Sequence, residues 1–180
     1  MNIGFKEWAV VCEAMGDGRQ AVIVRKGGIA EGREGFRFRH AEFFLMPTWF
    51  HEQVAKTRLP AGTPLPPQIP GTLRIGLAAR VEWTAFIDRL ETALALEPFH
   101  ILAESVIRER FEYDEARGVH VALVRVYRLE RPWEFPDAPK YGGCRSWVDL
   151  PAPPEGLGRE PVLDDARFAE VSAALRAVLG

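Results

Sequence analysis

Two histidines and two glutamates lie within thirteen positions of the sequence, as His40, Glu42, His51 and Glu52. An imidazole beside a carboxylate can act as a general base near neutral pH, so the candidate catalytic residues are His51, Glu52 and Glu42. All four side chains are also of types that ligate zinc or manganese. The zinc-protease pattern H-E-x-x-H is absent, because no second histidine follows His51 and Glu52 at the required spacing. A divalent metal is therefore an alternative at this cluster and not its leading interpretation.

The metal alternative makes a geometric prediction. If residues 42–46 form a strand, His40 and Glu42 share one face, and we expect a turn after Pro47 to bring His51 beside them. A metal-dependent nuclease would also need a D/E-x-K triplet next to an acidic residue on adjacent strands, and no such triplet occurs there. A serine hydrolase has no support either, because the G-x-S-x-G pattern is missing.

A basic segment lies just before this cluster. Residues 19–40 contain six Lys and Arg against two acidic residues. Arg25 and Lys26 end an apolar run and precede Gly27 and Gly28, a place where backbone N–H groups can face a phosphate. The full phosphate-loop patterns G-x-x-x-x-G-K-S/T and G-x-G-x-x-G are absent, so the two glycines also fit a plain tight turn.

Aromatic and basic residues alternate in the same region. Phe36 and Phe38 alternate with Arg37 and Arg39, which would place the two arginines on one face of a strand. Aromatic rings interleaved with basic residues, with Trp147 as a further ring, can stack bases while the charges neutralise phosphates. The net charge of −2 argues against strong non-specific binding by the whole chain. A nucleotide, a phosphorylated small molecule or a nucleic acid is therefore the expected partner class.

The composition fits one globular domain that holds these residues. The chain has 180 residues, of which 47% are hydrophobic and 27% charged, and we take residues 1–180 as a single domain. No apolar run approaches the roughly 20 residues of a membrane-spanning helix, and the first residues lack the features of a signal peptide. We therefore expect a cytoplasmic protein without membrane contact. Two cysteines, Cys12 and Cys144, are too few for a disulfide framework.

Apolar spacing predicts both helices and strands, without the regular alternation of a doubly wound fold. Phe5, Trp8, Cys12 and Met15 have helical spacing and predict a helix over residues 5–15. Strict alternation over residues 72–83 predicts a long strand with one face in the core. Prolines mark residues 59–71 as an internal loop, and an aspartate cap predicts a C-terminal helix over 164–179. We expect an α+β domain with a mixed or mainly antiparallel sheet of about five strands and helices packed on it.

Five short sequence runs, each occurring once, are spread over most of the chain. They are Phe5-Lys6-Glu7-Trp8-Ala9, Arg25-Lys26-Gly27-Gly28-Ile29, Pro47-Thr48-x-x-His51, Arg125-Val126-Tyr127-Arg128-Leu129 and Tyr141-Gly142-Gly143-Cys144-Arg145-Ser146-Trp147-Val148. Together they resemble a bacterial family described only as a domain of unknown function. The resemblance implies bacterial origin and a single domain. It implies no activity and names no catalytic residue.

The polar residues of these runs lead to one structural hypothesis. We expect them to converge at one end of the sheet, as a polar pocket rimmed by Trp49 and Trp147. The candidate ligand- and phosphate-binding residues are then Arg25, Lys26, Gly27, Gly28, Arg37, Arg39, Thr48, Arg125, Tyr141, Arg145 and Trp147.

Three function classes follow from the sequence. The leading one is binding or processing of a phosphorylated ligand, nucleotide or nucleic acid. The second is a metal-dependent hydrolase or nuclease that uses His40, Glu42, His51 and Glu52. The third is a non-catalytic interaction or regulatory domain whose partner binds the Pro-rich segment. No cofactor is implied beyond a divalent metal in the second class, and the residues do not decide between binding and catalysis.

Overall fold

The computed structural model describes residues 1–26 and 36–180. Its helices and strands, with the 3-10 helices labelled η, are β1 (Ile3–Trp8), α1 (Ala9–Gly16), β2 (Val22–Arg25), β3 (Glu42–Thr48), η2 (Val54–Lys56), β4 (Thr72–Ile87), α2 (Leu90–Leu94), η3 (Glu97–Phe99), α3 (Glu104–Glu112), β5 (Val119–Pro136), η4 (Pro139–Tyr141), β6 (Trp147–Asp149), β7 (Arg159–Pro161) and α4 (Asp165–Leu179). Residues 59–71 contain neither helix nor strand.

The strands described form one mixed sheet. Their order is β2-β5-β4-β3-β1-β6, and β7 pairs with β5 as a seventh strand. The pairing of β1 with β3 is parallel, and the other pairings are antiparallel. This confirms the α+β class and the mixed sheet, while the number of strands is larger than the predicted five. The two strands that the sequence did not predict are β1 and the three-residue β7.

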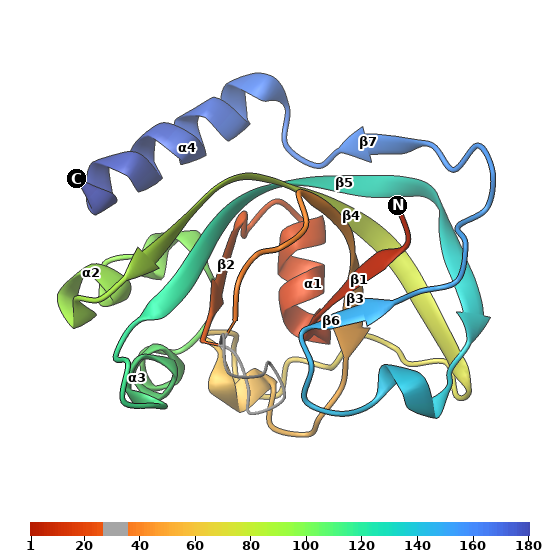
Figure 1. Cartoon of the computed structure of the whole chain (residues 1–180), viewed down its shortest axis with the longest axis horizontal. Coiled ribbons are helices and arrows are strands. Elements are labelled where there is room, and N and C mark those ends of the chain that lie inside the picture. Colours follow the sequence, from red (N-terminus) through yellow and green to blue (C-terminus); the bar gives the residue numbers. More distant parts are fainter. Residues whose placement is uncertain (27–35) are drawn as a thin grey trace.

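The sheet curves around α1, which lies in its concavity (Figure 1). The long strands β4 and β5 arch over this helix, and the register of their pairing shifts between Ile75 and Leu77 and again between Val81 and Trp83. Such irregularities bend a strand and increase its twist. The sheet therefore wraps far enough for side chains to connect β2 to the segment before β6, the two ends of the strand order.

Two hydrophobic clusters occupy opposite faces of β3. Phe43 and Leu45 belong to the cluster that contains α1, whereas Phe44 and Met46 belong to a second cluster with Trp133. Successive residues of a strand point to opposite faces, so β3 is covered on both sides. Among the residues described, no helix is long and apolar enough to cross a membrane.

The predicted helix over residues 5–15 is wrong in its first half. Residues 3–8 form β1, because Phe5 pairs with Leu45 of β3 on one side and with Trp147 of β6 on the other. The aromatic spacing that suggested a helix is therefore overridden by tertiary pairing. Residues 36–39, which we expected as a strand, lie outside the strands as well.

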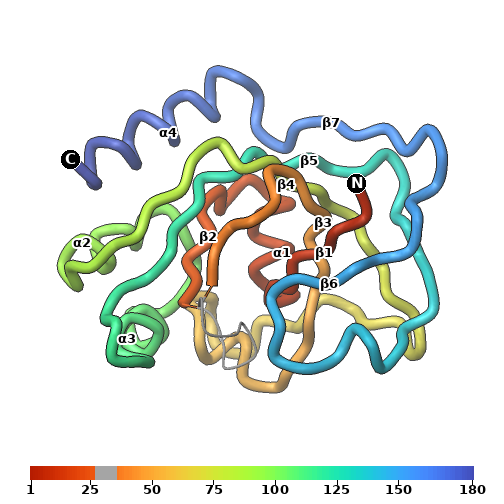
Figure 2. The backbone as a smooth tube through the Cα atoms, in the orientation of Figure 1, coloured from red at the N-terminus to blue at the C-terminus, as the bar shows by residue number. Residues whose placement is uncertain are grey.

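The ends of three strands lie close to where the candidate site is found. β1 runs directly into α1, and the ends of β1, β2 and β3 lie on the same side of the molecule together with η2 (Figure 2). The hydroxyl of Thr48 at the end of β3 donates to the carbonyl of Glu7 at 3.0 Å, which fixes two of these ends to each other.

Candidate functional site: a basic cleft where three strands end

A cleft of about 230 Å³ opens at this end of the sheet. It lies between the end of β2, the last turn of α3 and the segment that precedes β6. We call it the basic cleft. Among the residues described, those that line it are Arg25, Lys26, Glu109, Arg110, Tyr113, Cys144 and Ser146.

Arg25 is the last residue of β2 and connects the two ends of the strand order. Its Nε donates to the hydroxyl of Ser146 at 3.3 Å. One of its terminal nitrogens lies 3.7 Å from a carboxylate oxygen of Glu7 on β1. The guanidinium also lies over the ring of Phe5, with 5.2 Å between its carbon and the ring centroid. Arg25 is thus held in place from one side, while its remaining N–H groups are not used by these contacts.

Glu7 is the buried counter-charge of the cleft. Its side chain is only 3% exposed, and one carboxylate oxygen accepts from the backbone N–H of Trp8 at 2.8 Å. A buried carboxylate is costly unless it is paired. The nearby guanidinium of Arg25 supplies this pairing, so Glu7 holds Arg25 at the wall of the cleft.

Arg110 of α3 forms the opposite wall. It donates to the carbonyl of Val24 at 2.5 Å, and its guanidinium lies over the indole of Trp8 at 5.1 Å from the ring centroid. Burial lowers the pKa of Arg110 to about 10, and the carboxylate of Glu7 partly opposes this effect. The group therefore keeps its positive charge at neutral pH.

Lys6 places a further cation behind the cleft. Its side chain is largely buried, and its Nζ donates to the carbonyls of Gly142 and Gly143 at 2.8 and 2.9 Å. Burial lowers the pKa of Lys6, and the positive charge of Arg145 lowers it further. An ammonium has three N–H donors, so one remains after these two bonds.

Lys26 has a structural role in this arrangement. Its Nζ donates to the carbonyls of Ala116 and Gly118 and lies 2.9 Å from a carboxylate oxygen of Asp114. These three acceptors match its three donors. Lys26 therefore fixes residues 114–118 beside the cleft. Gly27 and Gly28, predicted as part of the same phosphate site, lie outside the described residues.

The charges around the cleft do not cancel. Two cations are neutralised by acidic partners: Lys26 by Asp114, and Lys56 by Glu109 at 3.4 Å. The cations that remain are Lys6, Arg25, Arg110 and Arg145. Arg25 and Arg110 interact with the buried carboxylate of Glu7. The exposed carboxylate of Asp137 acts on Lys6, but more weakly than the positive charges that lower the pKa of this lysine. Arg145 lies between the lining residues Cys144 and Ser146 in the sequence but does not itself line the cleft. It is exposed and has no hydrogen-bond or ion-pair partner among the residues described. The cleft thus has a surplus of positive charge with unused N–H donors.

Thr48 lies behind the cleft and not in its lining. Besides its bond to the carbonyl of Glu7, its own carbonyl accepts from the amide of Gln53 at 2.6 Å. The other atom of that amide accepts from the N–H of Val10 at 3.3 Å. The fully buried Gln53 therefore ties η2 to the start of α1. His51 is exposed in the turn between Thr48 and Gln53 and is not among the residues that line the cleft.

Tyr141 and Trp147 support the segment that carries Arg145. Tyr141 is buried in the second hydrophobic cluster, with its ring 5.6 Å from that of Phe135. Trp147 packs edge-to-face against Phe5 at 4.8 Å, and its indole N–H donates to the carbonyl of Arg37 at 3.1 Å. Both rings are therefore built into the fold.

The remaining predicted arginines lie elsewhere. Arg125 on β5 forms an ion pair with Asp165 at 2.5 Å and lies over the ring of Phe168. It attaches α4 to the sheet, so the expectation that it joins Lys26 at one pocket is wrong. Arg37 and Arg39 are exposed and do not line the cleft.

The four candidate metal ligands do not come together. Glu42 begins β3 and forms an ion pair with Arg159 at 3.0 Å, whereas His51 and Glu52 follow the far end of this strand. His40 lies against the ring of Trp147 at 4.9 Å. In residues 1–26 and 36–180 no group of three His, Cys, Asp or Glu side chains could hold a metal ion. The expectation that a turn returns His51 to Glu42 fails because β3 is extended along its whole length.

Several residues at the cleft were not predicted from the sequence. Lys6, Glu7 and Ser146 belong to the five short runs of the sequence, but their roles depend on contacts between distant segments. Arg110 gave no signal in the sequence, because it belongs to an ordinary charged helix.

Comparison with known proteins adds a family and a set of solved structures. A mutant of the ASCH protein from Zymomonas mobilis is 12% identical over 96% of this chain and 94% of that chain, with a TM-score of 0.48. A second structure of that ASCH protein is 14% identical over 95% of this chain and 93% of that one, with a TM-score of 0.45. A search of curated proteins found no significant match. The model of the family described as Domain of unknown function (DUF1802) matches residues 4–174, which confirms the resemblance to such a family and shows that the chain belongs to it.

Proposed function

We propose that the protein binds a phosphorylated ligand, nucleotide or nucleic acid at the basic cleft, with phosphate oxygens accepting from Arg25, Arg110 and Arg145. The observation that carries this proposal is the surplus of positive charge around a concave site. Guanidinium groups match phosphate oxygens in geometry, and bonds between charged partners are the stronger ones. Lys6 contributes charge from behind the cleft.

Preorganisation supports the same conclusion. Arg25 is held by Glu7 and Ser146, and Arg110 by the carbonyl of Val24, before any ligand arrives. A ligand that binds side chains already in place loses less affinity to the ordering of those side chains. Glu7 therefore contributes to binding without touching the ligand.

The proposal assigns no catalytic step. His51, Glu52 and Glu42 remain predicted catalytic residues, and the structure leaves them outside the cleft. Arg125 is not included among the phosphate contacts, because its guanidinium is used by α4.

Calorimetric titration tests the proposal. The ligands are inorganic pyrophosphate, ATP, and single-stranded DNA and RNA oligonucleotides, each at constant ionic strength. We expect at least one to bind and the Arg25→Gln variant to weaken it about 10- to 100-fold, the usual range for a lost hydrogen bond to a charged group. Arg145→Gln should also lower the affinity for this ligand. Because Arg145 is exposed, its substitution should leave the fold intact.

A matched control lies on the same helix as Arg110. Arg108 is exposed and forms an ion pair with Glu104 within α3. Arg108→Gln removes the same charge without touching the cleft, so its affinity should equal that of the unmodified protein. The proposal is refuted if no ligand of the panel binds, or if Arg145→Gln and Arg108→Gln change the affinity equally.

A further inference from the structure

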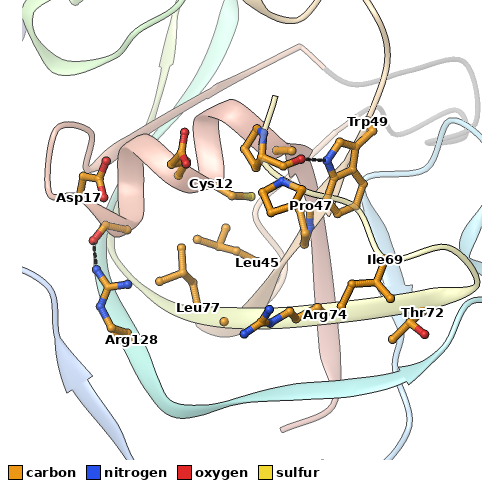
Figure 3. Close-up of a pocket in the computed structure, with 16 residues that line it drawn as sticks. Cys12, Asp17, Leu45, Pro47, Trp49, Ile69, Thr72, Arg74, Leu77 and Arg128 are labelled. Atoms are coloured by element: carbon orange, nitrogen blue, oxygen red, sulfur yellow. Dashed lines mark hydrogen bonds between the residues drawn. The ribbon is translucent and has the colours of Figure 1, made fainter. Parts of the chain in front are cut away.

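A second pocket, of about 330 Å³, lies on a different part of the molecule (Figure 3). It is enclosed by one face of α1, by the adjoining parts of β3 and β4, and by the Pro-rich segment. None of the residues that line the basic cleft belongs to it. We call it the proline-walled pocket.

One end of this pocket is apolar and fixed in shape. The indole N–H of Trp49 donates to the carbonyl of Pro66 at 3.0 Å, so the ring is held as a wall against the Pro-rich segment. Pro47 and Ile69 lie beside this ring, and Leu45 and Leu77 lie deeper in the pocket (Figure 3). This end can accept an apolar body about the size of a hydrophobic side chain.

The other end contains charges of both signs. Asp17 follows the C-terminus of α1, where helix carbonyls add negative partial charge, and Glu13 lies one turn earlier on the pocket side. Glu13 has no ion-pair partner among the residues described, whereas Asp17 pairs with Arg19. An ammonium group would find an unneutralised carboxylate at this end.

Two arginines also line the pocket, Arg128 near Asp17 and Arg74 between Leu77 and Ile69 (Figure 3). Arg128 of β5 donates to the carbonyl of Gly16, which brings its guanidinium to the end of α1 (Figure 3). Arg74 of β4 pairs only loosely with Glu134, at 3.4 Å between two half-exposed side chains. A guanidinium has five N–H donors, so both keep donors for a carboxylate.

We propose that the proline-walled pocket binds a small zwitterion with an apolar body, of the size and charge pattern of an apolar α-amino acid. Its ammonium pairs with Glu13 and its carboxylate with Arg74, while its apolar part lies against Trp49 and Leu45. A simple anion or cation would leave one sign of charge in the pocket unmatched. A wholly apolar ligand would desolvate these charged groups without replacing their hydrogen bonds. The inference does not depend on the function proposed for the basic cleft.

Gly76 offers a way to fill the pocket without disturbing the fold. It lines the pocket in β4, and a Cβ added there meets no atom of the described residues within 4 Å. Its φ is not in the left-handed region, so a larger residue fits the backbone. Gly76→Leu should therefore keep its stability while its side chain occupies the ligand's space.

Three probes of one shape separate the contributions. L-phenylalanine has both charges, phenethylamine lacks the carboxylate, and hydrocinnamate lacks the ammonium. In calorimetric titrations we expect L-phenylalanine to bind, and each analogue to bind at least about ten-fold more weakly, because each loses a bond between charged groups. Glu13→Gln should weaken the binding of L-phenylalanine but not that of hydrocinnamate. Arg74→Gln should weaken the binding of L-phenylalanine but not that of phenethylamine. Gly76→Leu should abolish the binding of all three compounds.

The control is Arg80→Gln, which removes an exposed arginine from the same strand outside the pocket. Its affinity for L-phenylalanine should be unchanged. The inference is overturned if neither L-phenylalanine nor L-leucine binds up to its solubility limit. It is equally overturned if the analogues bind as tightly as the zwitterion, or if Gly76→Leu binds normally.

Discussion

Burial of His100 predicts a loss of stability in mild acid. The side chain is 3% exposed, and its Nδ1 accepts from the N–H of Leu102 at 3.2 Å. Its Nε2 is buried without a hydrogen-bond partner among the residues described. Burial lowers the pKa of His100 from 6.5 to about 4, and the positive charges of Arg58 and Arg110 contribute in the same direction.

The direction of the effect follows from proton linkage. The folded state keeps His100 neutral, while the unfolded chain takes up the proton with a pKa near 6.5. The contribution to stability is therefore fully present above pH 6.5 and is lost as the pH falls towards 4. Because one pH unit corresponds to about 1.4 kcal/mol, the loss over this interval is about 3 kcal/mol.

The substitution His100→Asn isolates this contribution. An asparagine oxygen can accept from the N–H of Leu102 as Nδ1 does, but it does not titrate. Urea denaturation followed by tryptophan fluorescence at several pH values gives the free energy of unfolding of both proteins. We expect their difference to change by about 3 kcal/mol between neutral and acidic pH, in favour of the variant in acid.

The control is His51→Asn, which replaces an exposed histidine. Its free energy of unfolding should follow that of the unmodified protein at every pH. Parallel pH profiles for the unmodified protein and His100→Asn would refute the reasoning, because they would show that His100 binds its proton equally well in both states.

Two further predictions concern the stability of the segments around the cleft. Gln53→Ala leaves the N–H of Val10 and the carbonyl of Thr48 without their buried partner, so urea denaturation should show a loss of about 1–3 kcal/mol, and an unchanged midpoint would contradict the network. Gly118 has a φ of 139°, which strains any other residue, so Gly118→Ala should destabilise the protein by about 1–3 kcal/mol. Gly76→Ala, in open space within β4, should be near neutral in the same assay, and equal losses at both glycines would count against this account.

The fold class followed from the sequence because hydrophobic periodicity is a local signal. β4 was recognised from six alternating apolar residues, but Leu73 and Ile75 pack in one cluster while Leu77 and Ala79 pack in the other. At the irregular pairing between Ile75 and Leu77, the apolar side chains of β4 change from one face of the sheet to the other. The local sequence pattern does not predict this change. β1 was mistaken for helix for a related reason, since its identity comes from pairing with two distant strands.

Part of the cleft lining was singled out from the sequence. Arg25 and Lys26 were singled out from their place at the end of a strand, which is a sequence signal, and the structure puts both at the cleft. The metal cluster and Arg125 were misplaced, because closeness in sequence or membership of a short run does not give closeness in space. Lys6 and Ser146 meet because β1 pairs with β3 along one edge and with β6 along the other.

The most direct test of the basic cleft is a map of where an anion binds. A ¹H–¹⁵N spectrum titrated with inorganic pyrophosphate reports the backbone N–H of Trp8 and the side-chain N–H groups of Arg25 and Arg110. We predict that the largest shifts occur at these groups and require higher pyrophosphate concentrations in the Arg145→Gln variant. Shifts spread evenly over the surface, or centred on the proline-walled pocket around Trp49, would contradict the assignment of the basic cleft as the anion site.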